Sequence, residues 1–261
     1  MGAAALEAVR ERLACALVCA DFDGTLAQIV DHPSGAVPLP GAVETLSMLA
    51  RRCRCVAMVS GRPVADLFER VGVEGIVYTG LYGMETREVG GCITISPEGQ
   101  AAAAAIHSVR KELEAALARE PGAVLEDKGL TLAAHFRLAP DPGSAGERVR
   151  QVVADLALRH GLAVAGGRMV WELVPAGAVD KGRPILRLVE AEDAGAVLFA
   201  GDDVGDQAAF RALDEIAARG IPTCKVAVSS TEGPPDLLEA ADIVVDGPQG
   251  ALELLRSLIV S

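Results

Sequence analysis

The feature that most constrains this chain is a short apolar segment that ends abruptly at acidic residues. Leu13–Ala20 is apolar throughout, and the sequence DFDGT follows it at positions 21–25. A short run that is apolar at every position is typical of a strand buried on both faces, as in a parallel sheet. We therefore expect a buried strand that delivers Asp21 and Asp23 to its carboxyl end.

The same pattern recurs along the chain. Cys55–Val59 precedes the sequence SGR at 60–62, and Val197–Ala200 precedes GDD at 201–203. Further strands are expected at Gly75–Thr79, Val226–Val228 and Ile243–Val245, and helices at Gly41–Arg52, Pro63–Arg70, Gln207–Leu213 and Gly250–Val260. Strands that alternate with helices imply a parallel sheet whose functional site lies outside the carboxyl ends of the strands. The predicted fold class is therefore α/β, with a Rossmann-like parallel-sheet core.

The middle of the chain follows a different order. A helix at Gln100–Ala118 is followed by a hairpin at 123–138, a second helix at Gly146–Leu158 and a second hairpin at 162–174. Such an α-β-β-α-β-β unit would form a small α+β layer inserted into the sheet domain. We expect a core of residues 1–97 and 176–261 and an inserted domain of residues 98–175.

The two aspartates at 21 and 23 suit phosphoryl transfer. A carboxylate such as that of Asp21 can act as a nucleophile and form an aspartyl-phosphate. A second carboxylate, that of Asp23, can protonate the leaving oxygen and later deprotonate water. Gly24 permits the tight loop that would bring both to one site. Taken alone, the segment could equally be a turn with solvated aspartates.

Two more carboxylates, Asp202 and Asp203, follow the strand at 197–200. Gathering them beside Asp21 would be costly without a cation, and Mg²⁺ prefers such hard oxygen ligands. The expected ligands are Asp21, the backbone carbonyl of Asp23 and the carboxylate of Asp202. Asp203 and Asp206 are expected behind them, holding bound water or a lysine. Asp206 could equally be the N-cap of the next helix.

Two groups are expected to bind the phosphoryl oxygens. Ser60 can donate its hydroxyl, and backbone N–H groups from Gly61 onward add an anion site at a helix start. Lys181 can supply a point charge beside Asp21. Only four of the 24 basic residues are lysines, so a lysine within a motif is more informative than usual. A simple N-cap serine and a surface lysine are the alternatives.

The composition narrows the partners and the setting. The formal net charge of −12 argues against nucleic acid, whose phosphates select basic surfaces. No segment approaches the ~20 uninterrupted apolar residues of a membrane helix. The six cysteines lack the spacing of a zinc or redox pair, so we expect reduced thiols and a cytoplasmic location. The sequence does not fix an oligomeric state and is compatible with a monomer.

Four motifs follow one another along the chain: DFDGT at 21–25, SGR at 60–62, Lys181 and GDDVGD at 201–206. In this order they resemble the motifs of the haloacid dehalogenase superfamily of aspartate-nucleophile phosphatases. Within it, the chain is similar to the trehalose-6-phosphate phosphatase family from Asp21 to Phe210. The similar segments are 21–29 (DFDGTLAQI), 60–62, 80–85, 126–137 (EDKGLTLAAHFR), 172–175 (ELVP), 179–182 and 201–210 (GDDVGDQAAF). The resemblance implies a Mg²⁺-dependent phosphatase in which residues 98–175 form a cap that closes over the sugar. Thr25, Gly61 and Arg62 are expected to contact the substrate.

The resemblance also implies sugar contacts on the cap. The residues concerned are Glu126, Lys128 and Arg137 on the first hairpin, and Arg168 and Glu172 on the second. A polyol needs paired donors and acceptors, which glutamate with lysine or arginine supplies. A solvated sheet face is the alternative for these charges. His135 could bind substrate or pack between layers.

Two positions that contact substrate in the family differ in this chain. These differences bear on the identity of the sugar and not on the reaction. Tyr82 stands where the family usually has His, and Arg168 where it often has Lys. The favoured substrate is trehalose 6-phosphate. The alternatives with the same reaction are sucrose phosphate, mannosyl-phosphoglycerate and a pseudo-disaccharide phosphate of secondary metabolism. A non-catalytic sugar-phosphate sensor is disfavoured, because every expected catalytic residue is present.

Overall fold

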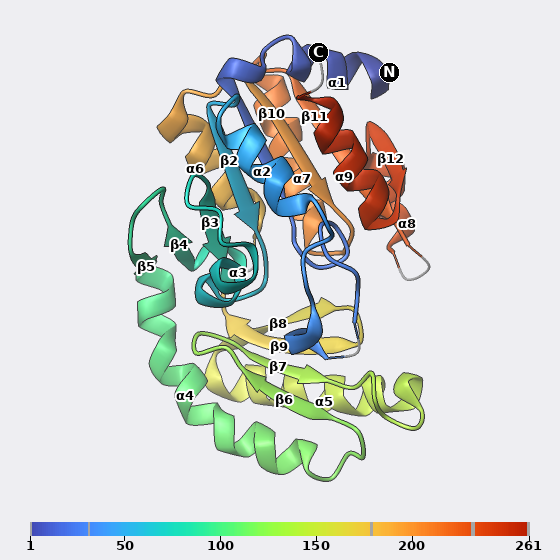
Figure 1. Ribbon diagram of the computed structural model, residues 1–261. Helices are drawn as coiled ribbons and strands as arrows, with labels where there is room; N and C mark the ends of the chain where they lie inside the picture. The colour runs from blue at the N-terminus through green and yellow to red at the C-terminus, as the bar shows by residue number, and fades with distance from the viewer. Residues whose placement is uncertain (1, 31, 178–179, 231–232, 260–261) are drawn as a thin grey trace. The chain divides into compact units, whose positions relative to one another are not determined.

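The computed structural model describes residues 2–30, 32–177, 180–230 and 233–259 (Figure 1). The chain divides into two compact units, one of Met1–Thr94 with Asp180–Ser261 and one of Ile95–Val179. The predicted insertion of residues 98–175 lies within the second unit. Its function as a cap stays a prediction.

The first unit is built on an eight-stranded sheet in the order β12-β11-β10-β1-β2-β3-β4-β5. The strands are β1 (Ala16–Ala20), β2 (Cys55–Val59), β3 (Val77–Gly80), β4 (Glu85–Arg87), β5 (Ile93–Ile95), β10 (Ala196–Gly201), β11 (Thr223–Ser229) and β12 (Ile243–Asp246). The strands from β12 to β3 pair in parallel, and β4 is antiparallel to β3. The predicted α/β class with a parallel sheet is confirmed.

Helices cover both faces of this sheet (Figure 1). One layer contains α1 (Gly2–Arg10), α2 (Ala42–Ala50), α3 (Val64–Val71) and α9 (Gly247–Ser257), and the other α6 (Gly182–Glu192), α7 (Asp206–Ala218) and α8 (Pro235–Ala240). Within β1, Val18 and Ala20 pack into the first layer, while Leu17 and Cys19 pack into the second. All five residues of β1 are therefore buried, as its continuous apolar run predicts.

Several boundaries differ from the prediction. β1 begins at Ala16 rather than Leu13, because Leu13–Cys15 forms a turn of 3₁₀ helix that leads from α1 into the strand. Neither α1 nor α8 was predicted, nor were β4 and β5. The two strands have only three residues each, and none of these residues is buried, so they lack an apolar run that could be recognised.

The second unit has a four-stranded antiparallel sheet in the order β6-β7-β9-β8, with two helices on one face. Its elements are α4 (Pro97–Leu117), β6 (Val124–Asp127), β7 (Leu132–His135), α5 (Pro142–His160), β8 (Leu162–Gly167) and β9 (Val170–Pro175). Leu132 and Ala134 join the core beneath the helices, as the alternation along β7 predicts. Ala133 pairs with Glu126 and Glu172, which turns their side chains to the opposite face.

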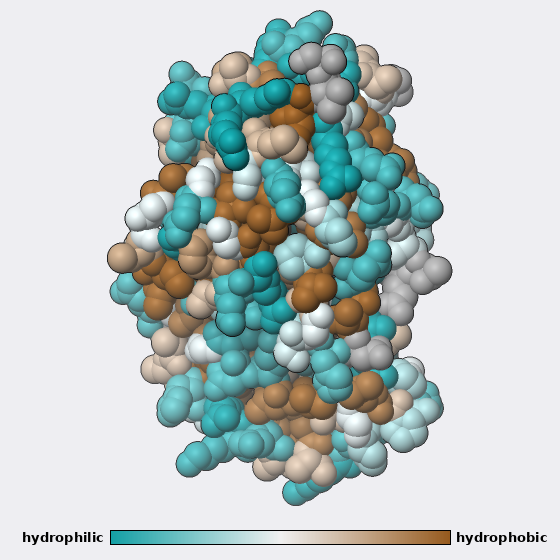
Figure 2. Space-filling view, in the orientation of Figure 1, coloured by the Kyte–Doolittle hydropathy of each residue, from teal (hydrophilic) through white to brown (hydrophobic). Residues whose placement is uncertain are grey.

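The helices, the surface and the cysteines can be compared with what the composition predicts. No helix in the described part of the chain is long and apolar enough to cross a bilayer. The face drawn in Figure 2 mixes hydrophilic and apolar residues. All six cysteines lie within the described ranges and are free thiols. Burial raises the pKa of Cys53 and Cys224 to about 12, so these thiols stay protonated and poorly reactive.

Candidate active site

Neighbouring strand ends place the predicted site residues at one edge of the first sheet. β1 lies between β10 and β2, and pairs with both in parallel. Asp21 follows β1, Ser60 follows β2 and Asp202 follows β10. Because the carboxyl ends of parallel strands meet at one edge, the three residues lie along that edge. All three are buried, with 4%, 2% and 1% of their surfaces exposed.

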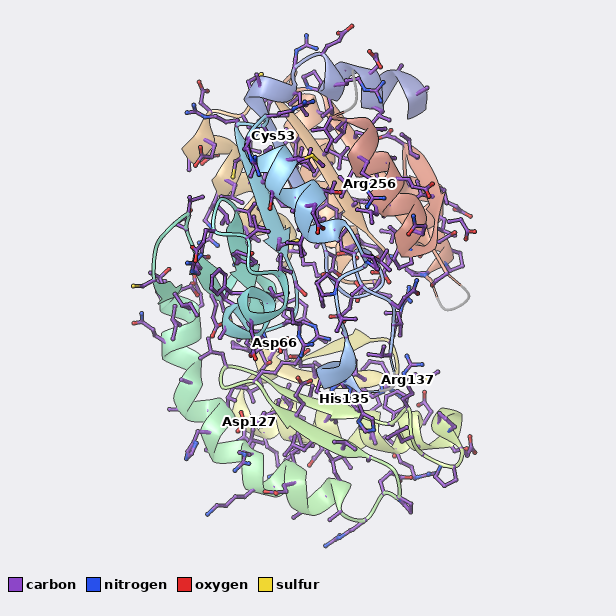
Figure 3. The ribbon with its side chains drawn as sticks, in the orientation of Figure 1. Cys53, Asp66, Asp127, His135, Arg137 and Arg256 are labelled. Carbon is purple, nitrogen blue, oxygen red and sulfur yellow. The ribbon has the colours of Figure 1, made fainter. Side chains whose placement is uncertain are left out.

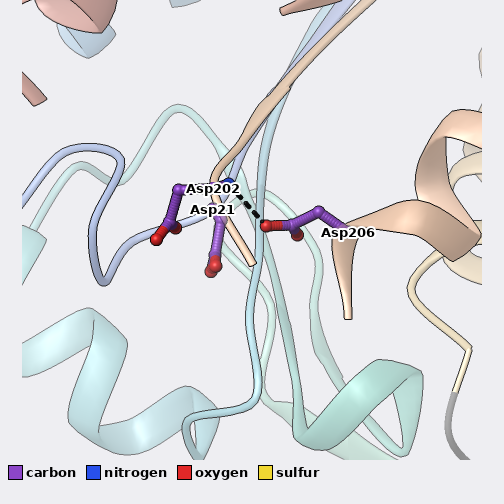
Figure 4. Close-up of side chains that lie close together, drawn as sticks. All are labelled: Asp21, Asp202 and Asp206. Atoms are coloured by element: carbon purple, nitrogen blue, oxygen red, sulfur yellow. Dashed lines mark hydrogen bonds between the residues drawn. The ribbon is translucent and has the colours of Figure 1, made fainter. Parts of the chain in front are cut away.

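Three carboxylates form a cluster at this edge. Asp21, Asp202 and Asp206 can each place one oxygen within 4.8 Å of the others (Figure 4). Asp206 Oδ2 accepts the backbone N–H groups of Asp202, at 2.7 Å, and Asp203, at 3.0 Å. These partners precede α7, whose N-cap position is Gly205, and Asp206 is the first residue of the helix itself. Asp206 therefore orders the loop of the metal-ligand candidate rather than serving as an N-cap.

Lys181 ties the cluster together. Its Nζ donates to Asp21 Oδ2 and to Asp206 Oδ1, both at 2.8 Å, and lies 3.8 Å from Asp203 Oδ1. The side chain is 3% exposed, so the surface-lysine alternative is wrong. Burial alone would lower the pKa of Lys181, but the charges of the three aspartates raise it well above its usual range. The lysine is therefore a fixed cation.

The cluster is short of positive charge. Burial raises the pKa of Asp21, and raises that of Asp206 to about 8, while Lys181 opposes both shifts. One lysine faces the carboxylates of Asp21, Asp203 and Asp206, with Asp202 beside them. Hard carboxylate oxygens gathered around an excess of negative charge suit a divalent cation. The donor set thus fits a metal of the Mg²⁺ type.

The loop after β1 is shaped around Asp202. Gly24 has a φ of 75°, and a Cβ on it would lie 2.1 Å from Asp202 Oδ2, so glycine is required on two counts. Thr25 was expected to contact the substrate. Its side chain is fully buried and donates its hydroxyl to Asp202 Oδ1 at 3.1 Å, and a substrate contact of Thr25 stays a prediction. The side chain of Thr25 therefore orients a carboxylate.

Arg62, predicted to bind substrate, engages two aspartates. Its Nε and Nη2 donate to Asp23 Oδ2 and Oδ1, at 2.5 and 2.7 Å. Its Nη1 donates to Asp66 Oδ2 at 2.7 Å, and Nη2 also donates to the carbonyl of Pro33 at 2.9 Å. Neither the pairing with Asp23 nor any role for Asp66 was predicted. The available signal was the i,i+4 spacing of Arg62, Asp66 and Arg70.

The loop from Ser60 to Arg62 lies against a strained segment. Leu81 and Tyr82 have φ values of 47° and 59°, in the left-handed region that bulky residues rarely adopt. A Cβ on Gly61 would lie 3.0 Å from Tyr82 Oη, so the phenol packs on Gly61. Strain of this kind persists where surrounding contacts impose it, often at functional sites. Tyr82 thus belongs to the neighbourhood of the predicted phosphoryl loop.

In the second unit, predicted sugar contacts gather on the sheet face away from the helices. Lys128 Nζ lies 3.2 Å from Glu172 Oε1 and 4.0 Å from Glu126 Oε2. The hydroxyl of Thr131 also donates to Glu172. His135 Nε2 lies 2.8 Å from Glu126 Oε2, so His135 belongs to this polar face, where Figure 3 labels it.

The two predicted cap arginines lie in the connections beside β7 and β9. Arg137 follows β7 and Arg168 precedes β9, so both lie in connections at the opposite end of β7 from Lys128. The N–H of Phe136 donates to the carbonyl of Met169 at 3.0 Å, which holds the two connections side by side. The structure therefore brings the two glutamates close to Lys128 and places Arg137 and Arg168 in two adjacent connections.

The mostly parallel sheet with acidic residues at its carboxyl edge agrees with the haloacid dehalogenase-type fold that the motifs predict, and solved structures share this fold. The C-terminal domain of the Candida albicans trehalose-6-phosphate phosphatase superposes with a TM-score of 0.84 at 23% identity, covering 98% of this chain and 96% of that one. A trehalose-6-phosphate phosphatase related protein gives a TM-score of 0.77 at 21% identity, covering 93% and 96%.

The sequence comparisons identify the family. The family model described as trehalose-phosphatase matches residues 19–240. The chain belongs to the trehalose-phosphatase family. It is 38% identical to the trehalose-phosphate phosphatase of Mycobacterium tuberculosis over 249 aligned residues. The aligned region covers 91% of this chain and 60% of that relative. The Mycobacterium leprae protein of the same name is 34% identical over 250 residues, covering 91% and 56%. The chain thus spans about 60% of the length of these relatives.

Proposed function

We propose that this chain is a magnesium-dependent phosphatase that hydrolyses trehalose 6-phosphate to trehalose and phosphate. The observation that carries the proposal is the buried pair of Asp21 and Lys181 at the end of β1, beside the carboxylates of Asp202 and Asp206. Membership of the trehalose-phosphatase family supports the same reaction and substrate.

Asp21 is the proposed nucleophile. One of its carboxylate oxygens forms a bond to phosphorus while the bond from phosphorus to the sugar oxygen breaks, which leaves an aspartyl-phosphate. Oδ2 accepts from Lys181 and Oδ1 accepts the N–H of Phe22 at 2.7 Å, so the carboxylate is held in one orientation. Holding reactants in the attacking geometry supplies a large part of catalysis.

Asp23 is the proposed acid and base. Its carboxyl group gives a proton to the sugar oxygen as that oxygen leaves. In the second step its carboxylate takes a proton from water, whose oxygen forms a bond to phosphorus. The bond from Asp21 to phosphorus then breaks, phosphate departs, and both aspartates return to their starting states.

Mg²⁺ is the proposed cofactor. Asp21, Asp202 and the backbone carbonyl of Asp23 would hold it, with Asp206 behind them, where it accepts from Lys181 and from the backbone N–H groups of Asp202 and Asp203. Bound there, Mg²⁺ would neutralise charge on the phosphoryl oxygens. The hydroxyl of Ser60 and the N–H groups that follow it would bind phosphoryl oxygens from the protein side.

The second unit is the proposed substrate-specificity cap. Glu126, Lys128 and Glu172 share one sheet face, where acceptors and a donor stand close enough to bind neighbouring sugar hydroxyls. Arg137 and Arg168 would add donors from the adjacent connections.

We also propose a cytoplasmic location, which the free thiols support.

The substrate is tested by measuring phosphate release from a panel of phosphorylated sugars in Mg²⁺. The panel contains trehalose 6-phosphate, sucrose phosphate, mannosyl-phosphoglycerate and glucose 6-phosphate. We expect the highest kcat/KM for trehalose 6-phosphate. A higher value for another disaccharide phosphate would reassign the substrate. Another disaccharide phosphate is the main alternative, because Tyr82, which packs on Gly61 of the predicted phosphoryl loop, departs from the family pattern. Absence of release from every compound would refute the phosphatase assignment.

A further inference from the structure

We propose that Arg62 is a positioning residue, which fixes the carboxylate of Asp23 for the two proton transfers and does not itself bind the phosphoryl group. This inference rests on the proposed phosphatase function and on the role proposed for Asp23. It replaces the expected substrate contact of Arg62 with a contact inside the protein.

The donors of Arg62 are almost fully used by the protein. A guanidinium has five N–H groups, and four of those in Arg62 bond to Asp23, Asp66 and the carbonyl of Pro33. The side chain is 9% exposed, and its guanidinium lies 5.4 Å from the centre of the Phe22 ring. An arginine poised to bind phosphate would keep its fork open. Here the fork closes on both oxygens of Asp23.

The fork is itself held from behind. Asp66, which Figure 3 labels on α3, accepts from Arg62 and also from Arg70 Nε and Nη2, at 2.9 and 2.7 Å. Arg70 donates in turn to the carbonyls of Ser34 and Ala36. The result is an alternating chain of four charges, tied to the backbone of the loop between β1 and α2. Such a chain leaves Arg62 one orientation and, through it, leaves Asp23 one orientation.

This arrangement suits a group that must transfer protons in two steps. The side chain of Asp23 is 35% exposed and would rotate freely without a partner. The Arg62 fork takes one lone pair from each carboxylate oxygen, and each oxygen keeps another that can carry the proton. The proton passes to the departing sugar oxygen and is replaced from water, so Arg62 gains and loses nothing. A misplacement of about 1 Å in such a group costs roughly 100-fold in rate.

The test compares Arg62→Lys with wild type on two substrates of different leaving group. Lysine keeps the positive charge but cannot hold both oxygens of a carboxylate in a fixed plane. A sugar oxygen needs a proton to leave, whereas the nitrophenolate of p-nitrophenyl phosphate leaves readily without one. Arg87→Lys is the control, since Arg87 is 12% exposed, pairs with Glu74 at 2.7 Å and lies on β4.

We expect Arg62→Lys to lower kcat/KM for trehalose 6-phosphate by roughly 100-fold. For p-nitrophenyl phosphate, kcat/KM should fall far less, while kcat and KM fall together, because hydrolysis of the aspartyl-phosphate still needs Asp23 as a base. Arg87→Lys should change neither substrate's constants. Equal losses of kcat/KM on both substrates would show that Arg62 acts on the phosphoryl group, and no loss on either would show that it is idle. Both results overturn the inference.

A second variant keeps the test decisive if Arg62→Lys does not fold. Asp66→Asn leaves Arg62 in place but removes the charge behind it, and should produce the same selective loss on trehalose 6-phosphate with smaller size. A loss shared equally by both substrates overturns the inference here as well. Failure of the proposed function is a separate result: wild-type protein would then release no phosphate from either substrate, and both proposals would fall.

Discussion

Gly24→Ala is the substitution whose effect follows most directly from the geometry of the cluster. A Cβ at this position would lie 2.1 Å from Asp202 Oδ2 and 2.4 Å from its Cγ, whereas real Cβ contacts essentially never fall below 3.0 Å. The carboxylate of Asp202 must therefore move by about 1 Å, which for a catalytic group costs roughly 100-fold in rate. The φ of 75° adds a backbone cost of roughly 1–2 kcal/mol for alanine.

Gly220→Ala is the matched control for this substitution. Gly220 has a φ of 84°, and a Cβ on it would meet nothing within 4 Å. Both variants therefore carry the backbone cost, but only Gly24→Ala displaces a carboxylate. We expect similar losses of backbone stability in urea unfolding, with a further loss in Gly24→Ala from the steric contact.

Activity and metal binding separate the two variants. In a phosphate-release assay, kcat/KM for trehalose 6-phosphate should fall by roughly 100-fold in Gly24→Ala and stay near wild type in Gly220→Ala. Calorimetric titration with Mg²⁺ should show weaker binding in Gly24→Ala alone. If Gly24→Ala matches Gly220→Ala in both assays, the position of Asp202 is not what Gly24 protects, and the reasoning is refuted.

The remaining predictions concern the charges around the site. Asp206→Asn should lower the free energy of unfolding by roughly 3 kcal/mol, because it breaks a buried pair with Lys181. Asp214→Asn on the same helix should cost far less, because the Asp214 side chain is 61% exposed where it pairs with Lys225. Equal losses in urea unfolding would contradict this. Partial burial opposes the shift at Asp66, but hydrogen bonds from arginines lower its pKa, so its stabilisation is complete above about pH 4 and is lost as pH falls through the lowered value. Unfolding between pH 2 and 5 should therefore be less pH-dependent in Asp66→Asn, and identical slopes would refute the pairing. Chelation with EDTA should stop turnover and added Mg²⁺ should restore it, whereas unchanged rates in EDTA would remove the metal from the account.

The sheet and the convergence of its strand ends could be predicted because they follow from local patterns. Runs such as Cys55–Val59 are apolar at every position, and only a strand covered on both faces buries such a run. Once the strands are parallel, topology alone brings the residues after β1, β2 and β10 to one edge. Lys181 was recognisable because lysine is rare in this chain, and it is in fact buried within the cluster.

The side-chain pairings at the site could not be predicted in the same way. Arg62 and Asp23 are 39 positions apart, and Thr25 and Asp202 are 177 apart. Both pairs join residues in loops, where neither the helical nor the strand period fixes the direction of a side chain. Which oxygen each donor meets depends on how separate loops pack at the sheet edge. Sequence patterns therefore predicted which loops meet at the sheet edge, but not the pairing of Thr25 with Asp202 or of Arg62 with Asp23.

The central claim is that Asp21 becomes phosphorylated during turnover. The most direct measurement is an acid quench of protein mixed with ³²P-labelled trehalose 6-phosphate and Mg²⁺, followed by counting of label on the protein. We expect wild type to carry label that hydroxylamine releases, and Asp21→Asn to carry none and to release no phosphate while remaining folded. Turnover without labelled protein, or label on Asp21→Asn, would contradict the claim.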